Sequence, residues 1–500
     1  MATIMSSSQI DHLHFILIPL MSPGHLLPMI DMAKLLSHHG VTVTIVTTPL
    51  NTARFISTIP RAVESGHRIR LLELPFPATT AGLPEGCENM DSLPSRSSIK
   101  SFFVASSMLQ KPFEEAFHEL KPPPSCIISG KNLAWTVETA RKFRIPRFFF
   151  DGMGCFAFSC THNMEVSKVH ETVSEFESFV VPGLPHRVEL TRARLPESLN
   201  PGSTDLIDVR NEMISAESVV DGILINTFEE LELDYVKQYR KIKGCKIWCI
   251  GPVSACNKLS SEKAERGGGG KDAIYYLKWL DAQEPNSVIY ACLGSICGLT
   301  GSQLKELGLG LEKSNKSFIW VIRGGQRSLE LEKWLADEKF EERNKDRGLL
   351  IRDWAPQVLI LSHPAIGGFL THCGWNSTTE GVSSGVPMVT CPLFAEQFIN
   401  EKLVVEVLAI GVSVRVERAV TWGMEDKCGV VMRRENVKEA IEKVMERGKE
   451  GEERRKRARE VGEMAKRAIE EGGSSYLNIK MFIQDVLHLQ HTKIGSQLCE

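Results

Sequence analysis

The sequence predicts an α/β fold made of two doubly wound, Rossmann-like domains. The chain has 500 residues, more than a single hydrophobic core normally supports. Short β-branched runs alternate with amphipathic segments, a pattern typical of strand–helix units around a parallel sheet. These runs form two sets, one in each half of the chain, so we expect two sheets of the same kind.

The expected strands of the first half begin close to the N-terminus. Their residue ranges are 15–20, 41–47, 69–74, 126–129, 147–150 and 222–226. A helical pattern at 27–37 follows the first of them and ends at Gly40. The expected strands of the second half are 287–293, 318–322, 349–352, 368–371, 388–391 and 411–414.

We place the boundary between the two domains near Pro252, which closes the last strand of the first half. Expected domains are therefore 1–252 and 253–470. The polar stretch after the boundary runs to four glycines at 267–270, which cannot hold regular structure cheaply and predict a flexible surface loop. The remaining segment, 471–500, has helical spacing and is a candidate for packing back onto the first domain.

Charge and cysteine content argue against several classes of protein. The net charge is −3, so no overall positive field would recruit nucleic acid or an anionic membrane. The 13 cysteines are scattered, which fits neither a disulfide framework nor a zinc site and indicates reduced thiols. The polar N-terminus lacks a signal-peptide pattern, and no apolar run is long enough to span a membrane. We therefore expect a cytoplasmic, monomeric protein.

The most informative stretch is 354–397. Within it, the strand expected at 368–371 is followed by a helix that begins at Trp375. A helix N-terminus offers free N–H groups and partial positive charge to a diphosphate. Side-chain donors gather at the same point: His372, Asn376 and Ser377.

Other residues of this stretch suit the rest of a nucleotide. Glu380 lies one helical turn after Asn376, where its carboxylate is placed to bind adjacent hydroxyls such as a ribose diol. Trp354 offers a flat face for a pyrimidine base, and Gln357 offers a neutral hydrogen-bonding group. Together these residues predict a nucleotide site.

The stretch resembles, along its whole length, the signature box of plant family 1 glycosyltransferases. The wider likeness runs from Leu13 to Ser475 and is similar to members that glycosylate triterpenoids, steroids and flavonoids. The resemblance implies a GT-B fold, in which two Rossmann-like domains face a central cleft. It also implies an acceptor in the N-terminal domain and a UDP-sugar in the C-terminal domain.

Carried over residue by residue, the resemblance implies a role for each position of the box. The uracil would be held by Trp354 and Gln357, the diphosphate by Ser295, His372, Asn376 and Ser377, and the ribose by Glu380, with Ala355 as a further residue of the nucleotide-sugar site. The sugar would be held by Trp375, Glu396 and Gln397. Glutamine at the closing position is similar to members that use glucose.

His25 is the candidate catalytic base. It follows Gly24 on what we expect to be a loop after the first strand, and ligands bind at the carboxyl ends of strands in α/β sheets. Removing a proton from an acceptor hydroxyl needs a base near neutral pH, which imidazole supplies. The Gly24-His25 pair also resembles the catalytic motif of the family.

The usual partner of that histidine is missing. The family pattern Ile-Ile-Ser-Asp-x-Asn-Leu resembles the run that starts at Ile127, but Gly130 stands in the aspartate position. A glycine cannot accept the second imidazole N–H. The general base contributes about 10²–10⁴-fold, so His25 acting alone would be slower without being inactive.

Two alternatives to an unaided His25 stay open. A nearby group can replace the aspartate, either Asn132 or Asp151, although Asp151 is expected two strands from His25, roughly 10 Å away. In the second alternative, the glycine was introduced deliberately or the protein is inactive.

We therefore expect an inverting O-glycosyltransferase that uses UDP-glucose and needs no metal. The alternative is a nucleotide-sugar-binding protein that has lost catalysis. The Gly-x-Ser-x-Gly match around Ser383 would suit a serine hydrolase, but it lies where we expect a helix to continue. The acceptor pocket is expected among three loops, at 75–82, 176–179 and 195–201.

Overall fold

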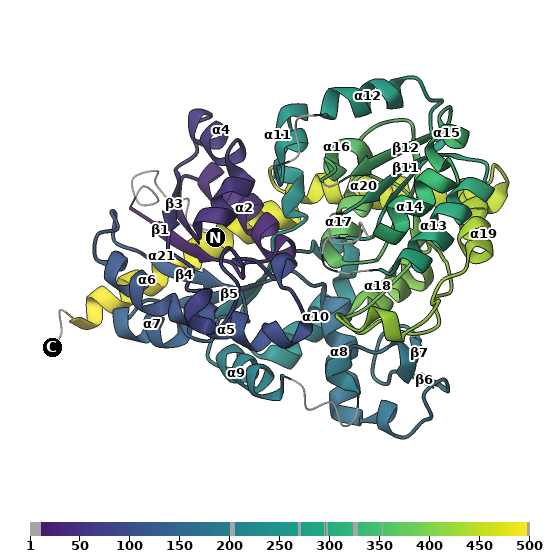
Figure 1. The fold of residues 1–500 in the computed structure, drawn as a ribbon. Coiled ribbons are helices and arrows are strands. Elements are labelled where there is room, and N and C mark those ends of the chain that lie inside the picture. Colours follow the sequence, from purple (N-terminus) through teal and green to yellow (C-terminus); the bar gives the residue numbers. More distant parts are fainter. Residues whose placement is uncertain are drawn as a thin grey trace.

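The computed structural model describes residues 12–200, 206–268, 272–294, 296, 299–323, 329–352 and 354–497. Two parallel sheets organise the chain (Figure 1). The seven-stranded sheet comes from the first half, and the six-stranded sheet comes from the second half. The predicted α/β fold with two Rossmann-like sheets is therefore confirmed.

The first sheet has the strand order β3-β2-β1-β4-β5-β8-β9. Its strands are β1 (His14–Ile18), β2 (Thr42–Thr47), β3 (Ile69–Glu73), β4 (Cys126–Ser129), β5 (Arg147–Asp151), β8 (Gly222–Ile225) and β9 (Ile247–Cys249). Strand β1 pairs with both β2 and β4, so the order reverses at β1. Such a reversal opens a crevice outside the carboxyl ends of the two strands.

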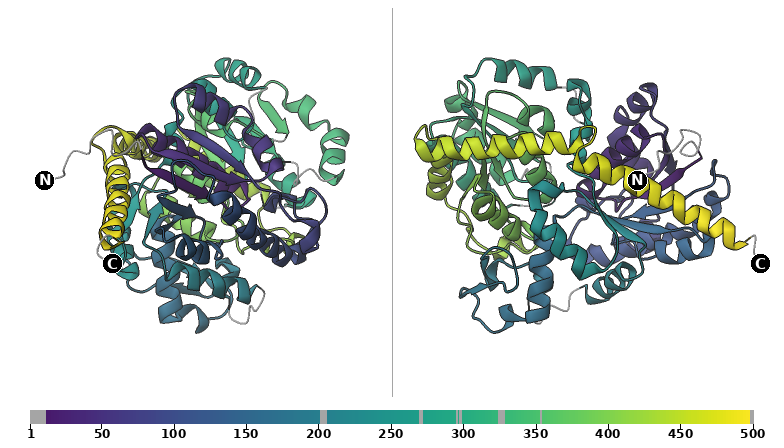
Figure 2. Two further views of the ribbon diagram at one scale, coloured as in Figure 1. Left: turned by 90° about the vertical axis from the view of Figure 1, so that its left-hand side faces the viewer. Right: turned by 180° about the vertical axis from the view of Figure 1, so that it is seen from behind.

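Helices of the first half cover both faces of this sheet (Figures 1 and 2). The longer ones are α2 (Pro23–His38), α4 (Thr58–Glu64), α5 (Ile99–Met108), α6 (Gln110–Phe117), α7 (Thr136–Phe143), α8 (Cys155–Ser167), α9 (Ile207–Glu217) and α10 (Glu229–Lys243).

The second sheet repeats the design with the order β12-β11-β10-β13-β14-β15. Its strands are β10 (Val288–Cys292), β11 (Ser317–Ile322), β12 (Gly348–Arg352), β13 (Ile366–Thr371), β14 (Met388–Thr390) and β15 (Gly411–Ser413). Here the order reverses at β10, which pairs with β11 and β13. Its helices include α12 (Ala273–Asp281), α13 (Gly301–Lys313), α14 (Leu329–Asp337), α15 (Phe340–Asn344), α16 (Gln357–Leu361), α17 (Trp375–Ser383), α18 (Gln397–Lys402) and α19 (Arg434–Met445).

All twelve strands expected in the two halves are present, with ends that differ by at most two residues. One predicted loop was wrong, because 176–179 runs into the antiparallel hairpin of β6 (Ser178–Val180) and β7 (Glu189–Thr191). Strands of three residues carry too little alternation to be distinguished from a loop.

Helix α2 also corrects a prediction, since it begins at Pro23 rather than at residue 27. Ser22 is extended and Pro23 occupies the first helical turn, a position where the missing N–H of proline costs nothing. His25 therefore lies in the first turn of a helix and not on a loop.

The segment between the sheets is more ordered than the surface loop we expected. It forms α11 (Ser260–Glu265), and Arg266 after it is only 8% exposed. Gly267 packs against Trp354 so closely that a Cβ on Gly267 would lie 2.1 Å from the indole atom Cζ2. The last two residues of the glycine run, Gly269 and Gly270, lie outside the described residues.

Two long helices end the chain, α20 (Lys449–Ile469) and α21 (Ser474–Gln497). Helix α20 runs along the second half and α21 runs back across the first (Figure 2). On α21, Phe482 contacts the rings of Phe15, Phe148 and Trp248, with centroid distances of 5.6, 5.0 and 5.0 Å. The C-terminal helix thus contributes to the core of the first half, although the domain boundaries themselves stay a prediction. No described helix has the length and apolar character of a membrane span.

Candidate active site

A cavity of about 400 Å³ lies between the carboxyl ends of the two sheets. Its walls come from segments that follow β1, β4 and β5 in the first half and β10 to β14 in the second. Every predicted site residue within the described part of the chain lines it: His25, Trp354, Ala355, Gln357, His372, Trp375, Asn376, Ser377, Glu380, Glu396 and Gln397. Ser295 lies outside the described residues.

The N-terminus of α17 forms one wall of the cavity. The first intrahelical bond runs from Thr378 N–H to Gly374 C=O at 2.9 Å, so the N–H groups of the first turn have no partner within the helix. Free N–H groups and the helix dipole favour negative charge here. The wall therefore suits a diphosphate.

His372 lies beside this helix start, between two glycines. A Cβ on Gly374 or on Gly294 would approach its Nε2 to 2.4 or 2.6 Å, so both positions need glycine. Burial lowers the pKa of His372 to about 4, and the charge of Arg323 acts in the same direction. The imidazole is therefore neutral near pH 7 and can donate only one N–H.

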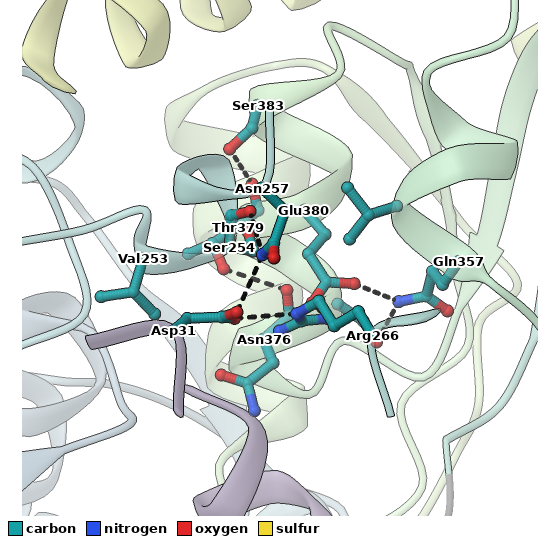
Figure 3. Close-up of polar contacts among 12 residues, drawn as sticks. Asp31, Val253, Ser254, Asn257, Arg266, Gln357, Asn376, Thr379, Glu380 and Ser383 are labelled. Carbon is teal, nitrogen blue, oxygen red and sulfur yellow. Dashed lines mark hydrogen bonds and ion pairs between the residues drawn. The ribbon is translucent and has the colours of Figure 1, made fainter. Parts of the chain in front are cut away.

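Trp354 and Glu380 occupy the end of the cavity where we expect the nucleoside. The guanidinium carbon of Arg323 lies 4.1 Å from the centroid of the Trp354 ring, a stacked arrangement. The Trp354 Nε1–H donates to the carbonyl oxygen of Arg266 at 3.0 Å. Gln357 Nε2 donates to Ser377 Oγ at 3.1 Å and to Glu380 Oε2 at 2.7 Å (Figure 3).

The opposite end of the cavity carries the residues expected to hold the sugar. Burial raises the pKa of Glu396, an effect that the nearby charge of Lys131 opposes. The Oε1 atom of Gln397 accepts N–H bonds from Leu393 and Phe394 at 2.9 and 3.1 Å, which leaves its NH₂ group as the donor available to a ligand.

Two residues of the box connect the halves of the molecule instead of pointing only at the cavity. Trp375 is 2% exposed and donates from Nε1 to the carbonyl oxygen of Asn226 at 2.7 Å. The ring lies against Gly154, where a Cβ would approach it to 2.5 Å. Asn376 donates to the carbonyl oxygen of Gly24 at 2.8 Å, one residue before His25. The box therefore places the candidate base next to the donor helix.

The His25 imidazole is half-buried in the cavity wall, and no described side chain hydrogen-bonds to it. Burial lowers its pKa to about 4, and the positive charge of Lys131 adds to the effect. His25 is therefore neutral near pH 7 and able to accept a proton, but no described carboxylate supports the imidazolium that would result.

Neither proposed substitute for the missing aspartate reaches His25. Asp151 ends β5, two strands from β1, and its carboxylate pairs with Lys131 at 3.2 Å. Asn132 lines the cavity, yet its buried Oδ1 atom accepts no hydrogen bond. The nearest atom to a Cβ added at Gly130 would be Leu20 N at 3.6 Å, an ordinary contact distance, so the position has room for a Cβ.

Four charged residues of the cavity wall were missed by the sequence reasoning: Lys131, Lys263, Arg266 and Arg323. Arg323 directly follows the strand expected at 318–322, so its place at a carboxyl end was a usable signal. Lys263 and Arg266 offer no such signal, because they lie in the segment between the two sheets and directly follow no strand of either.

A second cavity of about 590 Å³ adjoins the first, and the two share Phe394 and Ala395. It is lined in part by 195–200, a segment expected to contact the acceptor. The other two expected acceptor loops, 75–82 and 176–179, line neither of these cavities.

Two Rossmann-like sheets, a helix N-terminus on one side of the cavity and a histidine on the other define a nucleotide-sugar-dependent transferase of the GT-B class. The comparisons agree. Residues 276–448 match the family described as UDP-glucoronosyl and UDP-glucosyl transferase. The chain is 51% identical over 486 residues to UDP-glycosyltransferase 73C3 of Arabidopsis thaliana, covering 96% of this chain and 97% of the relative. The protein therefore belongs to the plant UDP-glycosyltransferases.

Solved structures show the same relationship. The chain is similar to UGT73P12 of Glycyrrhiza uralensis, complexed with glycyrrhetinic acid 3-O-monoglucuronide. The TM-score is 0.90, the identity 37%, and the match covers 97% of this chain and 98% of that one. It is also similar to TcCGT1 in complex with UDP, with a TM-score of 0.76, 27% identity, and coverage of 95% and 99%. The protein is accordingly an enzyme that transfers a sugar from a UDP-sugar to a small acceptor.

Proposed function

We propose that the protein is an inverting O-glycosyltransferase that moves glucose from UDP-glucose to a hydroxyl of a small lipophilic acceptor, a triterpenoid, steroid or flavonoid. The observation that carries the proposal is the shared cavity, in which His25 and the described donor residues face one space. UDP-glucose is a co-substrate, and the proposal includes no metal or other cofactor.

In the proposed reaction, neutral His25 accepts the acceptor's hydroxyl proton as that oxygen attacks the anomeric carbon. The bond from this carbon to the UDP oxygen breaks on the opposite face, so the anomeric configuration inverts. The negative charge that develops on UDP lies at the N-terminus of α17, beside His372. Preorganised donors of this kind are commonly the largest catalytic contribution.

Glucose is favoured as the sugar because glutamine at the closing position, Gln397, is similar to family members that use glucose. The free NH₂ group of Gln397 can donate to a sugar hydroxyl, and the Glu396 carboxyl can accept from one. A lipophilic acceptor is supported by the similarity to UGT73P12, whose structure holds glycyrrhetinic acid 3-O-monoglucuronide. We further propose that the protein acts as a monomer, because one chain supplies both sides of the site. We propose the cytoplasm as its location, because the scattered cysteines indicate reduced thiols.

One experiment tests the proposal. Purified protein is incubated with UDP-glucose, UDP-galactose or UDP-glucuronate and a panel of triterpenoids, steroids and flavonoids, and products are identified by mass spectrometry. We expect O-glucosides from UDP-glucose at the highest rate. A higher rate with either other donor would contradict the donor assignment.

The second candidate function is a nucleotide-sugar-binding protein without catalysis, which Gly130 and the lack of a described carboxylate beside His25 favour. The same panel separates the two. UDP binding by calorimetry without product from any acceptor would support the binding protein, whereas any glycoside formed above the enzyme-free control would exclude it.

A further inference from the structure

A buried triad of charges joins three segments that are far apart in the sequence. Arg266, after α11, lies between Asp31 on α2 and Glu380 on α17 (Figure 3). Its Nε donates to Asp31 Oδ2 at 2.8 Å, and its Nη1 donates to Glu380 Oε1 at 2.7 Å. The side chains of the three residues are 9%, 2% and 4% exposed, respectively.

Neighbouring groups fix the position of the triad. Asn257 Nδ2 donates to the other oxygen of Asp31 at 2.8 Å and to the carbonyl of Ser254 at 2.9 Å. Lys34 donates to Asn257 Oδ1 at 2.8 Å. Burial acts to lower the pKa of Arg266, but Asp31 and Glu380 outweigh it and raise the pKa, so the guanidinium stays charged.

The two carboxylates of the triad have different surroundings. Glu380 lines the cavity, whereas Asp31 does not. Asp31 instead lies two turns after His25 on the helix that carries the candidate base. Arg266 also accepts the Trp354 Nε1–H with its backbone oxygen, so this one residue contacts both nucleoside-binding candidates. The contacts tie the donor site to the N-terminal half.

We propose that Arg266 is a positioning residue that couples the donor site to α2. Its guanidinium pairs at the same time with Asp31 and with Glu380, the carboxylate expected to bind the ribose. The inference rests on the proposed function only in placing the ribose of UDP at Glu380. A carboxylate has about four acceptor positions, and Glu380 uses one for Arg266 and one for Gln357. The remaining positions are free for the two ribose hydroxyls.

Asp31 then acts on UDP binding without touching UDP. When Asp31 loses its charge, Arg266 interacts with Glu380 alone, and the Glu380 oxygens become weaker acceptors for ribose. Removing the charge of Arg266 breaks this link, so Asp31 no longer matters to the nucleotide. Non-additivity of this kind is the signature of coupled residues.

Titration calorimetry with UDP alone tests the coupling in the wild-type chain and in Asp31→Asn, Arg266→Gln and the double variant. We expect Asp31→Asn to weaken UDP binding by about fivefold or more, a typical size for coupling between sites. We expect the same substitution to change affinity by less than about twofold in the Arg266→Gln background. In steady-state kinetics, the effect of Asp31→Asn falls on the KM for UDP-glucose and leaves kcat nearly unchanged.

A matched control is Asp221→Asn. Asp221 also belongs to the N-terminal half and accepts the backbone N–H of Arg147 at 2.8 Å, but it contacts no member of the triad. This variant should bind UDP like the wild type. Thermal melting verifies that each variant is folded, and Arg266→Met replaces Arg266→Gln if the latter does not fold, because its long flexible side chain fills the buried space without a charge.

The outcomes separate this inference from the proposed function. Wild-type UDP affinity in Asp31→Asn, or an equal loss in both backgrounds, would overturn the coupling while leaving the glycosyltransferase assignment intact. Because no acceptor is used, missing product does not affect the test. A wild-type chain that binds no UDP would overturn both.

Discussion

Each half of the molecule places a histidine at the carboxyl end of a central strand, yet the two sites differ. His25 follows β1, where the order of the first sheet reverses, and His372 follows β13, which pairs with the reversal strand β10 of the second sheet. Burial lowers the pKa of both to about 4. His372 is enclosed by glycines beside the free N–H groups of α17. His25 has Lys131 as its charged neighbour and no carboxylate partner among the described residues.

The difference indicates that the two halves contribute to the reaction in different ways. In the C-terminal half, backbone N–H groups and a helix dipole stabilise charge, and many contacts share the task. In the N-terminal half, a single side chain is expected to move the proton. Removing one of many contacts should lower the affinity for UDP only in part. Removing the single base should lower the catalytic rate by its whole contribution.

The largest expected effect is therefore that of His25→Ala. We expect kcat to fall by about 10²–10⁴-fold, the usual contribution of a general base. The KM for UDP-glucose should stay within about twofold, because the His25 imidazole makes no hydrogen bond to a described residue that we expect to bind UDP. His38→Ala, near the other end of α2, is the control and should keep normal turnover. Normal turnover in His25→Ala would refute the base assignment.

The next largest effect is expected from Trp354→Ala, on the donor side. Stacking of a base on an aromatic ring contributes about 1–3 kcal/mol, so UDP affinity should fall by about 5–150-fold. Trp279→Ala, on α12 and away from the cavity, is the control. Unchanged UDP binding in Trp354→Ala would show that the uracil does not stack on Trp354.

The smallest expected effect comes from a variant that gives the N-terminal half its missing carboxylate. A Cβ at residue 130 meets no close contact, and we expect Gly130→Asp to raise kcat by up to roughly tenfold. Gly130→Ala fills the same space without charge and should not raise it. No gain from the aspartate would indicate that His25 already has another source of support.

The pH dependence of Gly130→Asp gives a second readout. The base acts in its neutral form, so the wild-type rate should fall only as pH drops through the His25 pKa of about 4. A carboxylate at residue 130 favours the imidazolium and raises that pKa. The acidic limb of the kcat profile should therefore move to higher pH in the variant. If the acidic limb of the kcat profile stays at the same pH in the variant, the ionisation of His25 does not determine that limb.

The sequence predicted which residues of the second half gather at the cavity, because they are close in the chain. The stretch 354–397 begins just after β12 and contains β13 and α17. The spacing of its residues therefore already predicts a strand followed by a helix at these positions. Strand ranges were also predictable, because fully buried parallel strands read as apolar runs.

What the sequence did not predict depends on contacts between distant segments. Arg266 lies in a polar, glycine-rich linker, and only the fold brings it between Asp31 and Glu380. The ion pair of Lys131 with Asp151 likewise needs two strand ends to meet. The early start of α2 was missed because Pro23 and Gly24 resemble a turn, although proline is favoured in a first helical turn.

We expect one half of the molecule to bind the nucleotide and the other half to supply the base. Titration of UDP into His25→Ala, Trp354→Ala and the wild type, side by side, separates the two roles. We expect wild-type affinity in His25→Ala and weakened binding in Trp354→Ala. Weakened binding in His25→Ala with wild-type binding in Trp354→Ala would contradict both expectations.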